Sequence, residues 1–75
     1  MRKRSVTIAG HRTSVALEPE FWDLLDQMAV ARGLTTTALI AGIDEGRESP
    51  NLSSALRVAV LDWLRTARSA QPEPG

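Results

Sequence analysis

Hydrophobic and polar residues alternate along two short stretches near the start of the chain. Residues 5–9, Ser-Val-Thr-Ile-Ala, and residues 12–17, Arg-Thr-Ser-Val-Ala-Leu, place apolar side chains at every second position. Because side chains of a β-strand point alternately to opposite faces, this pattern predicts two strands. In the second strand, burial of Val15 and Leu17 turns Arg12 outward.

Gly10 separates these two stretches, and two arrangements remain open there. Gly10 and His11 could form the centre of a tight turn, with glycine at the first central position, so that the stretches pair as a hairpin. Residues 1–10 could instead be an arm that precedes a single strand. His11 is the only histidine of the chain, and we interpret it as a turn residue rather than a metal ligand.

The apolar spacing then changes to the three- and four-residue period of helices. We predict a first helix from Pro19, a residue suited to the first helical position, to Arg32, just before Gly33. A second helix is predicted from the N-cap residue Thr35 to about Glu45. The apolar faces of these two helices are formed by Phe21, Trp22, Leu25, Met28 and Ala29, and by Leu39, Ile40 and Ile43.

Residues 46–50 are polar and either end the second helix or kink it. A third helical stretch follows to about Arg65, with Asn51 and Ser53 as alternative N-caps. Its apolar residues cover more than one face, and such a helix needs burial on several sides. They are Leu52, Leu56, Val58, Ala59, Val60, Leu61, Trp63 and Leu64. The final segment, 68–75, is predicted to be a disordered tail.

Length and composition narrow the class of protein. A chain of 75 residues forms at most one domain and buries only about 60% of the surface that its unfolded form exposes. Without cysteine it has neither disulfides nor thiolate metal sites, so we predict stabilisation by oligomerisation, as a dimer without a stable monomer. The chain shows neither a membrane span nor a signal peptide, and we expect it in the cytoplasm.

The formal net charge is 0, but the charges are unevenly distributed. Residues 1–17 contain four basic residues and no acidic residue, whereas residues 18–75 contain the other five basic residues and all nine acidic residues. This asymmetry favours an approach of the N-terminal segment to phosphate groups. Its basic residues are Arg2, Lys3, Arg4 and Arg12.

The predicted elements follow one another as a strand, a proline-led helix, a glycine turn and a threonine-capped helix. This order resembles that of the ribbon-helix-helix superfamily, to which the Arc and MetJ repressors belong. Residues 13–40 match this order without a gap. The Lys-Arg-Ser-Val-Thr-Ile start and the later Asn-Leu-Ser-Ser-Ala-Leu-Arg segment are also similar to a subfamily of short bacterial proteins. The resemblance places the ribbon-helix-helix domain at residues 12–67, after a basic arm or short strand at residues 1–11 and before the tail.

The resemblance implies a mostly α fold with an N-terminal β-strand, built as an intertwined homodimer with an additional or extended C-terminal helix. One strand from each chain would form a two-stranded antiparallel ribbon that enters the major groove of DNA. The side chains expected in the dimer core are Val15, Leu17, Phe21, Trp22, Leu25, Met28, Leu39, Ile40, Leu56, Val60 and Trp63.

The resemblance also implies which residues contact DNA. Base edges would be read by Arg12, Ser14 and Ala16, since arginine pairs with guanine, serine with several base edges, and the alanine methyl with thymine. Phosphates would meet a flexible basic start and the N-terminus of the second helix, where backbone donors are open at the positive end of the helix dipole. The residues expected there are Arg2, Lys3, Arg4, Thr35, Thr36 and Thr37.

The favoured interpretation is a sequence-specific transcriptional regulator, acting as a repressor on double-stranded DNA. Two alternatives are the antitoxin of a toxin–antitoxin pair and a dimerisation module that binds another protein. An enzyme is least favoured, because the sequence shows no nucleophile–base pair, phosphate loop or metal cluster, and no cofactor is expected. We interpret Asp23 and Asp26 as a solvated helix face, and Trp22 and Trp63 as core residues.

Overall fold

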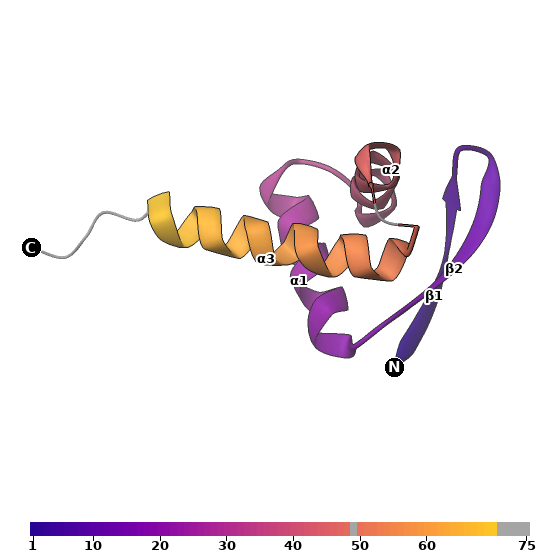
Figure 1. Cartoon of the computed structure of the whole chain (residues 1–75), viewed down its shortest axis with the longest axis horizontal. Coiled ribbons are helices and arrows are strands. Elements are labelled where there is room, and N and C mark those ends of the chain that lie inside the picture. The colour runs from indigo at the N-terminus through magenta and orange to yellow at the C-terminus, as the bar shows by residue number, and fades with distance from the viewer. Residues whose placement is uncertain (49, 71–75) are drawn as a thin grey trace, which may run out of the picture.

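The computed structural model describes residues 1–48 and 50–70, which form a hairpin followed by three helices. The hairpin lies at one end of the elongated molecule, and the C-terminal part of α3 extends away at the other end (Figure 1). The elements in chain order are β1 (Arg2–Ile8), β2 (His11–Leu17), α1 (Pro19–Ala31), α2 (Thr36–Gly46) and α3 (Leu52–Ala70).

The two strands pair with each other, so the ribbon of this structure belongs to one chain. The turn consists of Ala9 and Gly10, whose φ angles of 51° and 82° are both positive, as a type I′ hairpin turn requires. It lies one residue before the predicted turn at Gly10 and His11. The observed register pairs every residue of β2 with β1, from Ile8 opposite His11 to Arg2 opposite Leu17. The predicted turn, one residue later, would leave the first residues of β1 without pairing partners in β2.

Ala9 is the single non-glycine residue with a positive φ among the described residues. An L-residue pays about 1–2 kcal/mol in the left-handed region, so Ala9→Gly should raise the free energy of unfolding by about 0.5–1 kcal/mol. Urea unfolding measures this change. The control is Ala16→Gly, inside β2, which should lower stability by a similar amount. A destabilising Ala9→Gly would contradict the observed turn.

One face of the hairpin packs against the helices and forms the core with them. Val15 and Leu17 are 2% and 0% exposed, which confirms the predicted alternation of β2. Phe21 and Trp63, also expected in the core, are only partly buried. The buried side chains are Val6, Ile8, Val15, Leu17, Trp22, Leu25, Met28, Ala29, Leu39, Ile40, Leu56 and Val60.

The helix boundaries settle the alternatives that the sequence left open. The Thr35 hydroxyl accepts a hydrogen bond from the Ala38 amide at 3.1 Å, so Thr35 caps α2 as predicted. The second helix ends at Gly46 and is not continued into α3. Asn51, rather than Ser53, caps the third helix, because its Oδ1 accepts from the amide of Ser54.

The C-terminal helix is longer than predicted. It continues beyond Arg65 to Ala70, so the segment expected to be a tail from residue 68 begins within α3. The Arg-Ser-Ala sequence at 68–70 contains no residue that breaks a helix, which explains the extension. The rest of that expected tail, residues 71–75, lies outside the described residues.

Candidate nucleic-acid interface

The face of the hairpin that points away from the core is polar. In an antiparallel pair, residues directly opposite each other have their side chains on the same face. Since the other face contains the buried positions, this outer face is made of the pairs Lys3–Ala16, Ser5–Ser14 and Thr7–Arg12. Ala16 is half-buried and the other five residues are exposed. We call these six residues the polar ribbon face.

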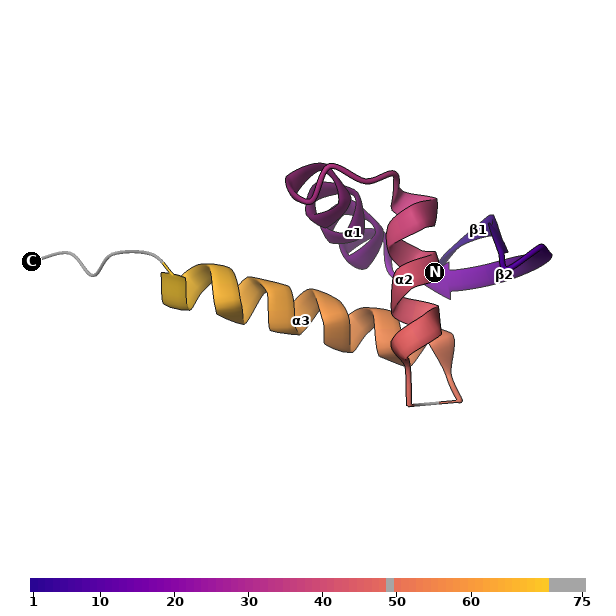
Figure 2. The ribbon, with the colours of Figure 1, turned by 90° about the horizontal axis from the view of Figure 1, so that it is seen from above.

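The polar ribbon face carries two positive charges and no acidic side chain. Figure 2 shows that the hairpin lies far from the C-terminal part of α3. Arg12 and Ser14 point outward, as the alternation of β2 predicts. Ser5 and Thr7 belong to the same face but were not recognised as site residues. The alternation around Val6 and Ile8 indicated that Ser5 and Thr7 share a strand face. Only the register of the hairpin places that face beside Arg12 and Ser14.

Arg4 lies on the core side of the hairpin and not on the polar ribbon face. Its Nη1 and Nη2 donate to Oδ1 and Oδ2 of Asp26 at 3.0 and 3.2 Å, and its guanidinium lies 4.5 Å from the centroid of the Trp22 ring. The Trp22 indole also donates to the carbonyl of Arg2 at 2.8 Å. The expectation of a flexible basic start was therefore wrong: residues 2–4 form part of β1, and their contacts hold it on α1. Asp26, expected on a solvated helix face, is partly exposed but is paired with Arg4.

The Arg4 hydrogen bonds lower the pKa of the Asp26 carboxyl, with a further hydrogen bond from Thr36 acting in the same direction. A carboxyl whose pKa is lower in the folded state stabilises the fold above its unfolded pKa of about 3.9, and that contribution is lost as the pH falls through the folded value.

Asp26→Asn should therefore lower the free energy of unfolding by about 0.5–1 kcal/mol at neutral pH, since both partners are partly exposed. The difference from the wild type should shrink between pH 4 and pH 2, as protonation removes the charge of the wild-type carboxylate. Asp23→Asn, on the exposed side of the same helix, is the matched control and should show a smaller change. Thermal unfolding at a series of pH values measures both. A constant Asp26→Asn difference down to pH 2 would rule out the charge effect.

The three threonines at the start of α2 have different positions. The Thr35 hydroxyl is used in capping, and that of Thr36 donates to Asp26 Oδ1 at 2.7 Å. Thr37 is exposed. Because the first backbone N–H groups of a helix lack partners within it, a phosphate contact there would use the backbone rather than the hydroxyls of Thr35 and Thr36. This contact stays a prediction.

The start of α3 is fastened to the end of β2. The hydroxyl of Ser53 donates to the carbonyl of Ala16 at 3.1 Å, and the guanidinium of Arg57 binds the Glu18 carboxylate at 2.9 Å. A hydrogen bond from the backbone N–H of Glu18 lowers the pKa of that carboxyl, and the hydrogen bond from Arg57 lowers it further. These contacts hold the C-terminal end of β2 against the start of α3 and so fix the orientation of the hairpin relative to the helices.

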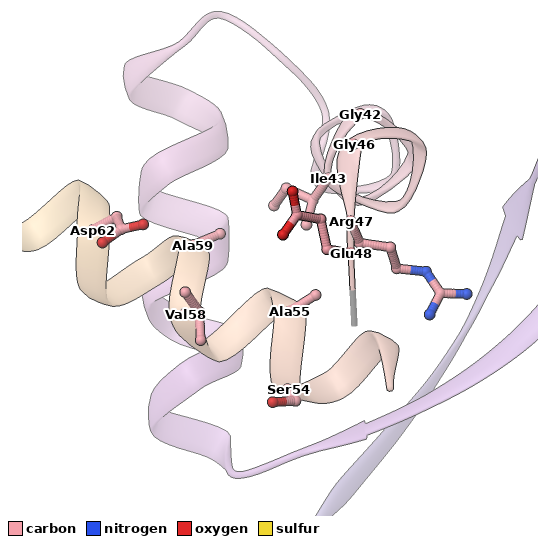
Figure 3. A pocket seen from close by; sticks show the side chains of 10 residues that line it. All are labelled: Gly42, Ile43, Gly46, Arg47, Glu48, Ser54, Ala55, Val58, Ala59 and Asp62. Atoms are coloured by element: carbon pink, nitrogen blue, oxygen red, sulfur yellow. The ribbon is translucent and has the colours of Figure 1, made fainter. Parts of the chain in front are cut away.

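A separate groove lies between α2 and α3 (Figure 3). Its apolar part comes from Ile43 on α2 and from Ala55, Val58 and Ala59 on α3. Arg47 belongs to this groove and forms an ion pair with Asp44 at 2.7 Å. Its lining comes from α2, from residues 47 and 48, and from α3, and it includes the exposed Val58.

An N-terminal antiparallel ribbon followed by helices that cover one of its faces is consistent with a ribbon-helix-helix fold. The family described as "ribbon-helix-helix domain" matches residues 1–64, and the chain belongs to this family. It is a DNA-binding family, to which regulators and antitoxins belong.

Among solved structures, the chain is similar to an uncharacterized protein from Bordetella pertussis Tohama I. The two share 35% sequence identity with a TM-score of 0.76. The match covers 95% of this chain but 62% of that one, so the present chain spans less than two thirds of the related protein. The comparison with curated proteins found no match. Within the described ranges, none of the helices has the length and apolar character needed to cross a membrane.

Proposed function

We propose that this protein is a sequence-specific DNA-binding regulator that presents its polar ribbon face to the major groove. The observation that carries the proposal is the composition of this face. Its hydroxyl, guanidinium and ammonium groups can donate to base edges and phosphates, and no carboxylate on it repels the DNA backbone. A two-stranded ribbon is also a shape that the major groove accepts.

Within this face, Arg12 and Ser14 are the proposed base-reading residues, and Ala16 offers a methyl group for thymine. Lys3 is proposed as a phosphate contact, together with the backbone at the start of α2. Arg4 is no longer proposed in that role, because its guanidinium is engaged by Asp26. Repression is the expected mode of action, in the cytoplasm, because a protein that covers an operator blocks other proteins from that DNA.

The proposed active form is a homodimer, as is typical of the family. Val58 and Leu61 on α3 are 53% and 52% exposed, and Leu64 is 38% exposed. Spaced three residues apart, they lie along one side of the helix, and Val58 also lines the apolar groove of Figure 3. A second copy that covers this surface would supply the burial that so short a chain lacks on its own.

A dimer without a stable monomer should unfold at a temperature that rises with protein concentration, because association favours the folded state by mass action. Calorimetry from about 1 to 100 μM measures the shift, and sedimentation gives the mass. Leu61→Lys should weaken association, whereas Arg65→Lys, on the same helix, should not. A folded monomer at micromolar concentration would contradict the proposed dimer.

DNA binding itself is tested by titrating the protein with a random-sequence duplex at several salt concentrations. Counterion release predicts that affinity falls linearly on a log–log scale, with a slope of about −0.9 for each phosphate neutralised. Lys3→Gln should flatten the slope without changing the fold. Deleting residues 1–4 is a poorer test, because it also removes the Arg4–Asp26 pair. Absence of binding at low salt would overturn the proposed function.

An antitoxin is the second candidate, and the exposed apolar side chains on α3 are the observation that favours it. Such a surface could contact a toxin instead of a second copy of this chain. Coexpression with the product of an adjacent gene, followed by copurification, would distinguish the two candidates. A stable complex that depends on Val58 and Leu61 would favour the antitoxin, while an isolated homodimer would favour the regulator.

A further inference from the structure

Among the described residues, the edge of β2 that faces away from β1 is not paired with a strand, and the structure shows which backbone groups point there. Along an antiparallel strand, successive residues direct their backbone groups alternately to the two sides. The Ala16 carbonyl accepts a hydrogen bond from Ser53 on α3, so it points away from β1. Arg12 and Ser14 have the same parity as Ala16, and their N–H and C=O groups therefore lie along the same edge.

Beside this edge is a groove lined by Thr13, Ser14 and Val15 on one side and by residues 50–53 on the other. The backbone groups of Arg12 and Ser14 on this edge of a seven-residue strand favour pairing with another strand, because strand edges are templates for pairing. When β2 pairs with the β2 of a second copy, the backbone groups of both strands form the same hydrogen bonds. Such a self-complementary contact is what a two-fold symmetric dimer requires.

The midpoint of β2, Ser14, sets the register that pairs the whole strand with its copy. In that register Ser14 faces Ser14 of the second copy, and Arg12 faces Ala16 of the second copy. No like charges stand directly opposite each other, which favours the pairing. The resulting sheet has four strands in the order β1, β2, β2, β1, with both polar ribbon faces on the same side.

Such a sheet is too wide to enter the groove completely. Neighbouring strands lie about 4.8 Å apart, so the two outer strands are separated by about 14 Å, whereas the major groove is about 12 Å wide. The two β2 strands fit inside the groove, and each β1 strand comes to lie over one of its phosphate-lined edges.

Building on the proposed function, we propose that β1 is a phosphate-binding strand of a four-stranded sheet, in which Lys3, Ser5 and Thr7 contact the DNA backbone while Arg12 and Ser14 of β2 read bases. The two strands of one hairpin then have different roles. Ser5 and Ser14 can test this difference in roles between β1 and β2. Both are exposed serines, and they lie directly opposite each other across the hairpin.

Lysine substitutions at these two serines separate the roles. Ser5→Lys should strengthen binding to selected and random duplexes by the same factor, and should steepen the log–log salt slope by about 1.8 units per dimer. The preferred base sequence should stay unchanged. Ser14→Lys should instead change the preferred sequence, because its side chain meets base edges. If Ser5→Lys changes base preference, β1 enters the groove and the proposal is wrong.

Cysteine substitutions test the sheet without DNA, and the natural chain has no cysteine to interfere. Ser14→Cys should form a disulfide-linked dimer under mild oxidation, because paired Cα atoms about 5.5 Å apart are within disulfide range. Ser5→Cys should not, since its two copies lie about 14 Å apart.

Either equal cross-linking of the two cysteine variants or a dimer that Ser14→Cys does not cross-link would overturn the four-stranded sheet. Failure of the proposed function looks different. In that case the wild-type protein binds no duplex at low salt, whatever the cross-linking shows.

Discussion

Replacing Arg12 with alanine should remove about 1–3 kcal/mol of discrimination at one base pair in each half-site, a loss of about 5- to 150-fold per site. The guanidinium is exposed on the polar ribbon face, opposite Thr7, where it can donate two parallel hydrogen bonds to guanine. Its removal leaves the core unchanged, so the unfolding temperature should stay close to that of the wild type. Binding to the selected duplex and to variants changed at one base pair measures the loss.

Two further variants make this result specific to base reading. Arg12→Lys keeps the charge but loses the two-pronged donor geometry, so it should retain affinity for random DNA and lose discrimination. Arg65→Ala removes an exposed arginine from α3 and should change neither property. An Arg12→Ala protein that is strongly destabilised, or equally weakened on every duplex, would exclude Arg12 from base reading.

Leu17→Ala should lower the free energy of unfolding by about 2–5 kcal/mol, the range for a leucine truncated in a packed core. Leu17 is fully buried, with 0% of its surface exposed, at the end of β2. The cavity would lie where the hairpin meets the helices. Urea unfolding measures the change, and Leu34→Ala is the matched control.

Leu34 is 45% exposed, so its truncation should cost less than about 1 kcal/mol. DNA binding by Leu17→Ala should fall only as far as the folded fraction falls. A Leu17→Ala protein as stable as the wild type would show that β2 does not pack with this face inward.

The sequence alone was sufficient for most of the secondary structure, because local rules determine it. Pro19 and Gly33 bound α1, Thr35 caps α2, and the alternation around Val15 orients β2. The turn was displaced by one residue because Ala9 adopts a positive φ, a conformation that propensity does not predict for alanine.

The candidate site was less accessible to sequence reasoning, because it depends on contacts between distant residues. Arg4 appeared to be one of three equivalent basic residues, yet Asp26, 22 positions away, engages it on the core side. Ser5 and Thr7 became part of the polar ribbon face only through the register of the hairpin. Family resemblance implied a ribbon with one strand from each chain, and it did not indicate that β1 pairs with β2 within the same chain.

Selection of bound duplexes from a random pool, followed by titration of the enriched sequence at about 150 mM salt, tests the central claim most directly. We expect enrichment of two copies of a short motif in inverted orientation, because a two-fold symmetric dimer presents the same polar ribbon face to each half-site. The enriched duplex should bind at least about 10³-fold more tightly than random DNA. A pool without enrichment, and equal affinity for every duplex, would contradict sequence-specific reading by the hairpin.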